Sequence, residues 1–312
     1  MSAKVCLVVG QNANASVGEI AEIVNGKPTA YRTVPDAGGI NGISCPSPTS
    51  GCEAVGYGQS PSYAPIALAV SRAGVPRAVK TVTSASGDNL DAVSCFRSIA
   101  SCEAVGQALD GNAVALLSLH NGQPATPRTV SVADGAFIES TAIACLSATR
   151  CRAVGSYPVG TGASQQLRGF AITVNSGRPS AANTAASFGL NAISCPRPGH
   201  CEISGSSVAG RGFVAALPAR TVTSVHRLKT MSAYAVSCPS TKTCTVVGST
   251  GGAAPKAALM TLAGGKPGPI KTVPGAAVLT CVSTPTTKFY EAIGQLLLGS
   301  NDSQRLVTSH EQ

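Results

Sequence analysis

The chain has 312 residues, of which 12% are charged and 4% are aromatic, and it contains 34 Gly and 20 Pro. This composition is rich in turn formers and poor in the Glu, Lys and Leu of helices, which excludes a helical solenoid, and apolar runs such as residues 113–119 are too short to cross a bilayer. The net charge of +9 suits an anionic partner. Because Lys and Arg are scattered singly, without stacking aromatics between them, we do not expect that partner to be nucleic acid.

A short strand-like phrase that ends in glycine returns along the whole chain. It reads CLVVG at its first occurrence, and successive copies begin 43 to 50 residues apart at Cys6, Cys52, Cys102, Cys151, Cys201, Cys244 and Tyr290. A period of this length is typical of arrays in which each repeat is one unit of about four strands. The chain is therefore predicted to be a repeat array.

The stretch 191–225 shows the pattern of one repeat. Strands are predicted over 191–195, 201–205, 212–217 and 220–225, with turns between them. In other repeats the turn between the third and fourth strands is marked by Asn-Gly or Gly-Gly, which supply the positive φ that a tight hairpin needs, at residues 25–28, 121–124 and 264–267.

Such antiparallel units need neighbours to cover both faces, and a radial array of them is a β-propeller. We therefore predict an all-β fold, a seven-bladed β-propeller of four-stranded antiparallel blades, as a single domain over residues 1–312. A β-sandwich would not repeat seven times at one period, and a parallel β-helix would have shorter coils without hairpin turns.

Ten of the 12 cysteines form local pairs with five or six residues between the partners. A zinc site would need closer cysteines and a second pair or histidines nearby, so disulfides are the better interpretation. Repeated disulfides indicate an oxidising compartment and hence export from the cell. The predicted pairs are Cys45–Cys52, Cys95–Cys102, Cys145–Cys151, Cys195–Cys201 and Cys238–Cys244.

The repeated Ser-Cys-Pro and Cys-x-Ala-Val-Gly phrases resemble those of exported propeller-like repeat proteins of actinobacteria, most of which are uncharacterised. The resemblance covers nearly the whole chain. It implies an extracellular or cell-envelope location, but it supplies no catalytic residues, because the matching residues are structural.

The two ends of the array differ from its middle. Cys6 heads a second strand with no first strand before it, so the first blade is incomplete, and we expect an upstream extension with a fourth strand, a first strand and a signal peptide. Alternatively the ring is incomplete, or Cys6 pairs with Cys281. In the last repeat Cys281 is aligned with the first cysteine and Tyr290 with the second, which predicts that Cys281 is a buried thiol without a local partner.

The sequence indicates no catalytic, cofactor-binding or metal-ligating residues. No Walker loop, HExxH, EF-hand or dinucleotide motif occurs, and residues 205–209 match a nucleophile elbow only in part. Asp88 and Asp91 fit no calcium-loop spacing. The four His lie in different repeats, at 120, 200, 226 and 310, and we expect no cofactor.

Two sets of like charges recur at fixed places in the repeat. Glu follows the second cysteine position at Glu53, Glu103, Glu202 and Glu291, and we interpret these residues as a ring of charge. A base precedes Thr-Val in the fourth strand at Arg32, Lys80, Arg128, Arg220 and Lys271. This basic set is either a surface for a polyanion or a protection of exposed strand edges against association, and we favour the second.

The leading hypothesis is a secreted or cell-envelope binding or interaction module, whose partner is an acidic cell-wall polymer or another envelope protein. The alternative is an exported hydrolase or lyase whose catalytic residues converge from separate blades on the central funnel. His120 or His226 beside a carboxylate and an Arg would favour the enzyme, and dispersed polar residues would favour the module.

Overall fold

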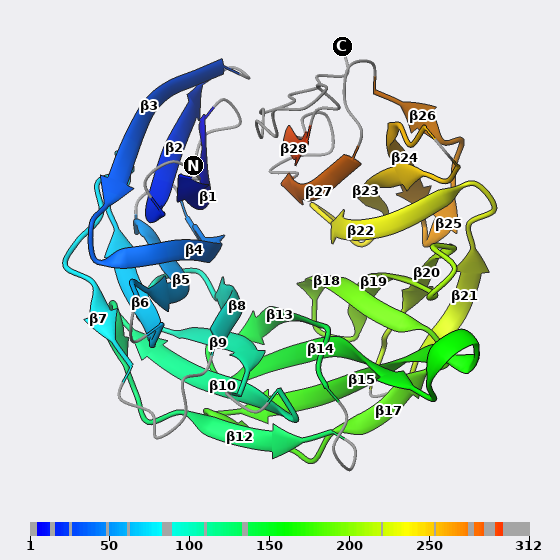
Figure 1. The fold of residues 1–312 in the computed structure, drawn as a ribbon, viewed down its shortest axis with the longest axis horizontal. Helices are drawn as coiled ribbons and strands as arrows, with labels where there is room; N and C mark the ends of the chain where they lie inside the picture. The colour runs from blue at the N-terminus through cyan, green and yellow to red at the C-terminus, as the bar shows by residue number, and fades with distance from the viewer. Residues whose placement is uncertain are drawn as a thin grey trace. The chain divides into compact units, whose positions relative to one another are not determined.

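The computed structural model describes residues 5–12, 16–24, 27–47, 50–60, 63–82, 89–108, 111–132, 137–219, 221–252, 254–273, 278–283 and 291–295. Over these residues the chain is built from antiparallel strands and one short 3-10 turn (Figure 1). None of the described helical segments is long and apolar enough to cross a membrane. His310 and Arg220 lie outside the described residues.

The strands form two compact units. The first comprises residues 1–153 and 171–183, and the second comprises residues 154–170 and 184–312. The sheet of strands β13–β17 contributes to both units.

The first unit begins with three sheets in chain order. The first sheet consists of β1 (Val5–Asn12), β2 (Val17–Val24) and β3 (Lys27–Val34). The second consists of β4 (Ala37–Ser44), β5 (Cys52–Gly58), β6 (Pro65–Val70) and β7 (Lys80–Thr81). The third consists of β8 (Asn89–Cys95), β9 (Cys102–Gln107), β10 (Ala113–His120), β11 (Gln123–Pro124) and β12 (Arg128–Ser131).

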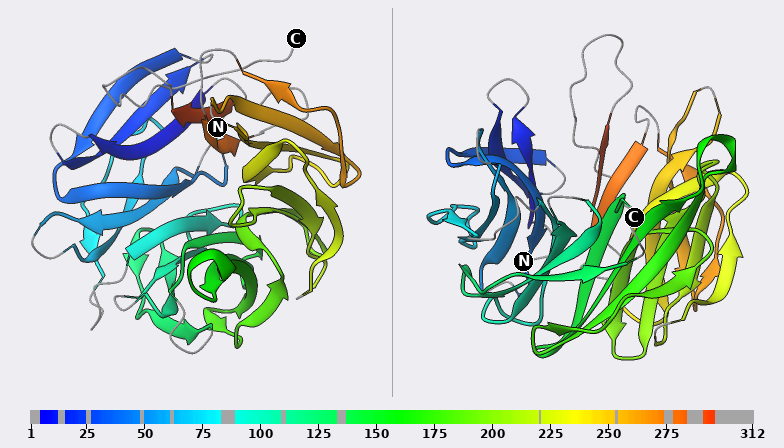
Figure 2. Two further views of the ribbon diagram at one scale, coloured as in Figure 1. Left: turned by 45° about the vertical axis from the view of Figure 1, so that its right-hand side comes forward. Right: turned by 60° about the horizontal axis from the view of Figure 1, so that its bottom comes forward.

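The fourth sheet consists of β13 (Ser140–Ser147), β14 (Arg150–Val159), β15 (Gln166–Asn175), β16 (Arg178–Pro179) and β17 (Asn183–Ala186). The 3-10 turn η1 (Gly162–Ser164) connects β14 to β15 and is the green coil in Figure 2. In this sheet and in the third, the predicted fourth strand is split into two short pieces that both pair with the third strand. Pro124 and Pro179 stand at these splits, and a proline has no N–H to donate to a strand ladder.

The second unit continues with three further sheets. The fifth sheet consists of β18 (Gly189–Arg197), β19 (His200–Ser206), β20 (Gly212–Ala216) and β21 (Thr223–Arg227). The sixth consists of β22 (Met231–Ser237), β23 (Thr243–Thr250), β24 (Ala257–Ala263), β25 (Lys266–Pro267) and β26 (Lys271–Thr272). The seventh consists of β27 (Val278–Ser283) and β28 (Glu291–Gln295). The predicted fourth strand over 220–225 is wrong in its bounds, because β21 begins only at Thr223, after a turn that contains Pro218.

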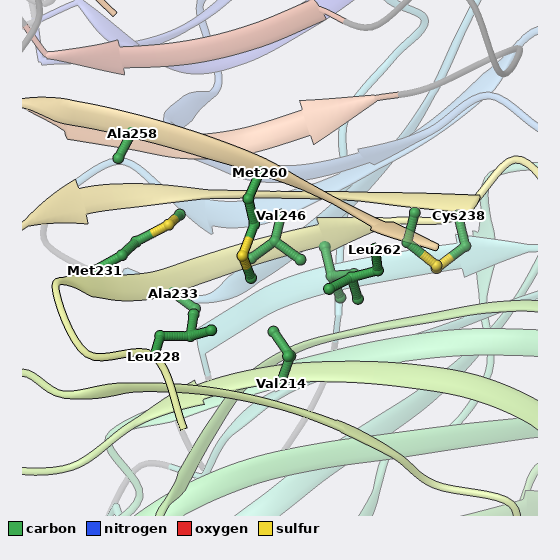
Figure 3. Packing of buried hydrophobic residues seen from close by; sticks show 11 residues of the cluster. Val214, Leu228, Met231, Ala233, Cys238, Val246, Ala258, Met260 and Leu262 are labelled. Atoms are coloured by element: carbon green, nitrogen blue, oxygen red, sulfur yellow. A yellow bond between two sulfur atoms is a disulfide. The ribbon is translucent and has the colours of Figure 1, made fainter. Parts of the chain in front are cut away.

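The hydrophobic core lies between consecutive sheets. In the first unit, Leu7 and Ile20 of the first sheet pack with Ile40 and Leu68 of the second. In the second unit, Val214 and Leu228 pack against a cluster from β22–β24 that includes Met231, Val246, Met260 and Leu262 (Figure 3). In both clusters the apolar face of one sheet is buried against the next sheet along the chain, as predicted from the repeat.

All five predicted disulfides are present. Each joins the end of a first strand to the start of the second strand, over a sequence separation of 6 or 7 residues. The predicted hairpin turns are also confirmed where they are described, with φ of +52° at Asn121 and +78° at Gly122 and with positive φ at Gly264 and Gly265.

The strand register corrects the alignment of the last repeat. Cys281 is level with Ile293 of β28, as Gly42 is level with Val55 of β5, so Cys281 does not occupy the first cysteine position. That position falls three residues later, at Thr284, within a Ser-Thr-Pro phrase that replaces Ser-Cys-Pro. The prediction went wrong because the alignment was fixed on the cysteine itself.

Candidate functional site

The first strands of consecutive sheets are joined through the Ser of the Ser-Cys phrase. Its hydroxyl accepts the backbone N–H of the first cysteine in the next repeat. Three described pairs show this bond: Ser44 with Cys95 at 3.0 Å, Ser94 with Cys145 at 2.9 Å, and Ser194 with Cys238 at 3.0 Å. The repeated Ser is therefore explained as a contact between repeats.

A β-bulge lies four residues before the first cysteine of several repeats. The register shifts place Asn41, Asp91 and Asn191 at the extra residue of these bulges. A bulge re-aims the side chain at the extra residue. Because each first strand is an edge of its own sheet, these polar side chains reach the neighbouring repeat.

In the first unit these side chains form a continuous line of hydrogen bonds, which we call the inner polar chain. Asn41 Nδ2 donates to Asn89 Oδ1 at 2.9 Å, and it also lies 2.9 Å from the Leu90 carbonyl oxygen. Asn89 Nδ2 donates to Asp91 Oδ1 at 3.0 Å, and Thr141 Oγ1 donates to Asp91 Oδ2 at 2.7 Å. The chain thus links β4, β8 and β13.

Asp91 is the ionisable member of the inner polar chain. Burial raises its pKa to about 6, and the hydrogen bond from Thr141 offsets part of that rise. A carboxyl with such a pKa can act as a general acid or base near neutral pH. Both of its oxygens, however, already accept hydrogen bonds from neighbouring side chains. The geometry therefore suits a link between repeats.

Asn191 takes the place of Asp91 in the second unit. Its Nδ2 donates to the Ala233 carbonyl oxygen at 2.9 Å and lies 3.0 Å from Ser206 Oγ. An uncharged amide can therefore fill this position, again as a bond to the next repeat. Among the residues that the structure describes, no group of three or more His, Cys, Asp or Glu could hold a metal ion.

The Glu residues after the second cysteine are not a surface ring, which corrects the sequence interpretation. Glu53 is fully buried, and Glu103 and Glu202 are half-buried. The side chain of Glu291 lies outside the described part of the chain. Each approaches the glycine turn of the following repeat: Glu53 lies at the Gly122 backbone, Glu103 near Gly177, and Glu202 near Gly265. In the first repeat Leu7 holds the equivalent place and lies against Gly74.

Glu53 is the most perturbed of these carboxyls. Burial raises its pKa to about 7, and the backbone N–H of Gly122 offsets part of the rise. Neither carboxyl oxygen makes a hydrogen bond of normal geometry. Burial also raises the pKa of Glu103, whose carboxylate accepts the Ser118 hydroxyl at 2.9 Å, and the pKa of Glu202.

The fourth repeat carries Arg152 at this position. Its side chain is buried, and burial, followed by the nearby charge of Arg150, lowers its pKa. In the sequence, the repeat that follows has Pro218-Ala219 where other repeats have a glycine turn. In this pair of consecutive repeats, the Glu of the fourth repeat and the glycine turn of the fifth are both replaced.

The basic residues of the fourth strands lie on sheet edges where they are described. Lys80, Arg128 and Lys271 are exposed, on β7, β12 and β26. Arg32, on β3, is half-buried, and its guanidinium donates to the Ala73 carbonyl oxygen at 2.9 Å. These placements are compatible with either of the two interpretations of the set.

Among the three described histidines, His120 acts on a carboxyl: its charge offsets part of the burial-driven rise in the pKa of Glu103. His120 Nδ1 lies 2.8 Å from the Ala100 carbonyl oxygen, and the nearby Ser118 donates to Glu103. His200 Nε2 lies 3.0 Å from an Arg197 guanidinium nitrogen, and both side chains are exposed. His226 is on β21, opposite Val214.

Sequence reasoning missed the inner polar chain and the burial of the Glu set. A signal for the inner polar chain exists in the repeat, since a polar residue stands four positions before the first cysteine at Asn41, Asp91, Thr141 and Asn191. Their partners are about 50 residues away in sequence, for example Thr141 to Asp91. Only the packing of repeats brings them together.

Comparison with known proteins shows the fold. No protein-family model matches the chain, and no curated protein sequence matches it. Solved β-propeller structures do match. The β-propeller domain of Cps50 (Swd1) from Myceliophteria thermophila is 10% identical with a TM-score of 0.59, over 94% of each chain.

Two further structures are similar over most of their length. The Dos1 propeller is 9% identical with a TM-score of 0.58, over 93% of this chain and 79% of its own. YCF48 bound to D1 peptide is 13% identical with a TM-score of 0.55, over 95% and 86%. The repeated antiparallel sheets and these likenesses define the chain as an all-β protein with a β-propeller type of fold, here with five disulfide-linked hairpins.

Proposed function

We propose that the chain is a seven-bladed propeller exported to the cell surface or envelope, where it acts as a binding module for an anionic cell-wall polymer. The observation that carries this proposal is that the polar groups of the repeats are engaged with one another. The Ser44 hydroxyl accepts a hydrogen bond from Cys95 of the next repeat, and the Asp91 carboxylate accepts one from Thr141 of the next repeat. The Glu103 carboxylate accepts one from Ser118 of its own sheet. Within each unit the repeats thus build a connected scaffold, and recognition is left to the exposed turns.

Two further observations support the proposal. Five disulfides are typical of proteins outside the reducing cytosol. The net charge of +9 favours anionic partners. Among similar structures, YCF48 is a protein bound to a peptide, and a binding role for this chain is in keeping with that example. Because one fold hosts many functions, the likeness to YCF48 supports a binding role but does not identify the ligand.

The second candidate is an exported hydrolase or lyase, and Asp91 is the observation that favours it. Its raised pKa, about 6, places one carboxyl in the range of an acid or base catalyst. Its two hydrogen bonds weigh against this role, since a catalytic carboxyl needs an oxygen directed at the substrate.

One experiment separates the two candidates. Oxidised full-length protein is incubated with isolated cell walls, and both sedimentation with the walls and release of soluble wall fragments are followed. We expect the protein to sediment with the walls and to release no fragments. Fragment release that is lost in Asp91→Asn would replace the binding module by the enzyme, because Asn keeps the shape found at Asn191. Protein that stays in the supernatant and releases nothing would contradict both.

A further inference from the structure

The two ends of the sheets in the first unit carry opposite charge. One end holds the turns between first and second strands and between third and fourth strands, and we call it the turn end. The hydrogen bonds of Ser44 with Cys95 and of Ser94 with Cys145 show that consecutive sheets of this unit have their turn ends on the same side. The approach of Glu103 to Gly177 shows the same alignment.

The turn end is basic and free of acidic residues. Its turns span residues 24–27, 45–52, 70–77, 95–102, 120–123, 145–151 and 175–178, and none of them contains Asp or Glu. Six exposed basic side chains stand in or beside these turns: Lys27, Arg72, Arg77, Arg97, Arg150 and Arg178. His120 is exposed there as well.

The segments that connect strands at the other end have the opposite composition. They span residues 12–17, 34–37, 58–65, 81–89, 107–113 and 131–140 and contain no Lys or Arg. Their described acidic residues are Asp36 and Glu139, and both are exposed. Asp88, Asp110 and Asp134 belong to the same segments in the sequence and lie outside the described residues. A segregation this complete is not needed for edge protection, which requires only that each exposed strand be charged.

Carboxyls near the turn end do little to offset its charge. Glu53 is buried and Glu103 is half-buried, and burial raises the pKa of both. Glu22, on β2, is half-buried and accepts a hydrogen bond from Thr29 Oγ1 at 3.3 Å. The exposed charge of this end is therefore positive.

We propose that the turn end of the first unit, rather than the fourth-strand residues Lys80, Arg128 and Lys271, binds the anionic polymer, and that the polymer is a linear phosphodiester polymer of the cell envelope. This inference rests on the proposed function and assigns its surface. Five of the six basic residues are Arg, whose planar guanidinium binds phosphate through two parallel hydrogen bonds. The turns offer no open aromatic platform, since Phe96 lies under the Arg97 guanidinium at 5.0 Å, so recognition is directed at backbone charge instead of at sugar or base faces.

The same end of the sheets in the second unit has a similar character. Its turns carry the exposed basic residues Arg197, Lys242 and Lys266 and no Asp or Glu. The connections at the other end of these sheets are basic as well, with exposed Arg211, Arg227, Lys229 and Lys256. The basic turn end therefore recurs along the array, in keeping with a polymer that offers many equivalent charges, and the opposition between the two ends is a property of the first unit.

Two triple variants with the same change in net charge test the proposal. Arg72→Gln/Arg97→Gln/Arg178→Gln removes charge from the turn end, and Lys80→Gln/Arg128→Gln/Lys271→Gln removes as much from the fourth strands. The probe is purified glycerol-phosphate teichoic acid, and thermal unfolding checks that both variants fold. We expect the turn-end variant to bind about tenfold more weakly, which corresponds to about 1.4 kcal/mol, and the fourth-strand variant to bind nearly as the native protein does. Native binding should weaken steeply with added salt.

Other outcomes overturn the proposal in distinguishable ways. Equal losses in both variants would mean attraction by net charge alone, and a larger loss in the fourth-strand variant would place the surface there. Tighter binding to polygalacturonate or to duplex DNA would replace the phosphodiester wall polymer by a carboxylate polymer or by nucleic acid. Association of the protein with itself at low salt, lost in the turn-end variant, would identify the partner as the acidic end of a second copy. Binding to whole walls without binding to teichoic acid would leave the proposed function standing and remove only this inference.

Discussion

Gly106→Ala is expected to destabilise the folded protein by about 3 kcal/mol, the upper end of the usual cost of overpacking, because an added methyl group has no room. A Cβ at Gly106 would lie 1.7 Å from the Asn89 carbonyl oxygen, which belongs to the facing first strand and cannot rotate away. Domain stability is typically about 5–15 kcal/mol, so the loss is a large part of the total. Urea unfolding of the two proteins measures it.

Gly10→Ala is the matched control. Gly10 ends the same phrase in the first repeat, and a Cβ there would meet nothing within 4 Å. We expect this variant to unfold within about 1 kcal/mol of the native protein. The same crowding holds at Gly56, Gly205 and Gly248, where a Cβ would lie 2.1, 2.0 and 1.9 Å from a backbone carbonyl oxygen. Equal free energies of unfolding for Gly106→Ala and Gly10→Ala would contradict the close approach of the bulged first strand β8 to Gly106 of β9.

Glu53→Gln is expected to stabilise the protein at pH 8 by up to about 3 kcal/mol and to flatten its stability between pH 4.5 and 8. Burial raises the pKa of Glu53 in the fold to about 7 from 4.5, so the fold favours the neutral carboxyl. This contribution to stability is fully present below pH 4.5 and is lost as the pH rises through 7. Gln is neutral throughout and avoids the loss. Urea unfolding from pH 4.5 to pH 8 measures the effect.

Glu139→Gln provides the control for Glu53→Gln, since Glu139 is exposed in the same unit. We expect its stability to follow that of the native protein at each pH. The raised pKa values of Glu103 and Glu202 should leave part of the pH dependence in Glu53→Gln, with the same sign. A Glu53→Gln protein that is less stable than the native protein at pH 8 would show that the carboxylate is needed by the Gly122 turn in its ionised form.

The features that could be predicted from the sequence are local ones. Cys95 and Cys102 are seven residues apart, and a disulfide between them needs only a hairpin. The turn at Asn121-Gly122 needs only two residues with positive φ. The repeat period then predicts that such hairpins stack, since each sheet must cover its apolar face with a neighbour.

The features that could not be predicted depend on the stacking itself. The sequence predicts Glu53 to be a surface charge, but the turn at Gly122 in the next repeat covers its side chain. The sequence shows Gly106 only as the end of a strand. In the structure, the Asn89 carbonyl oxygen of the facing strand leaves no room for a side chain at this position. Asp91 meets Thr141 only through the bulge in β8, and a bulge has no reliable signal in a single repeat.

The central claim, that the chain is an exported array of disulfide-linked hairpins, is tested most directly by peptide mapping without reduction of protein recovered from culture medium and cell envelope. The structure predicts five linked peptides, which join Cys45 to Cys52, Cys95 to Cys102, Cys145 to Cys151, Cys195 to Cys201 and Cys238 to Cys244. Recovery of these ten cysteines as free thiols, or as a zinc complex, would contradict both the export of the chain and the hairpin links on which its repeats are built.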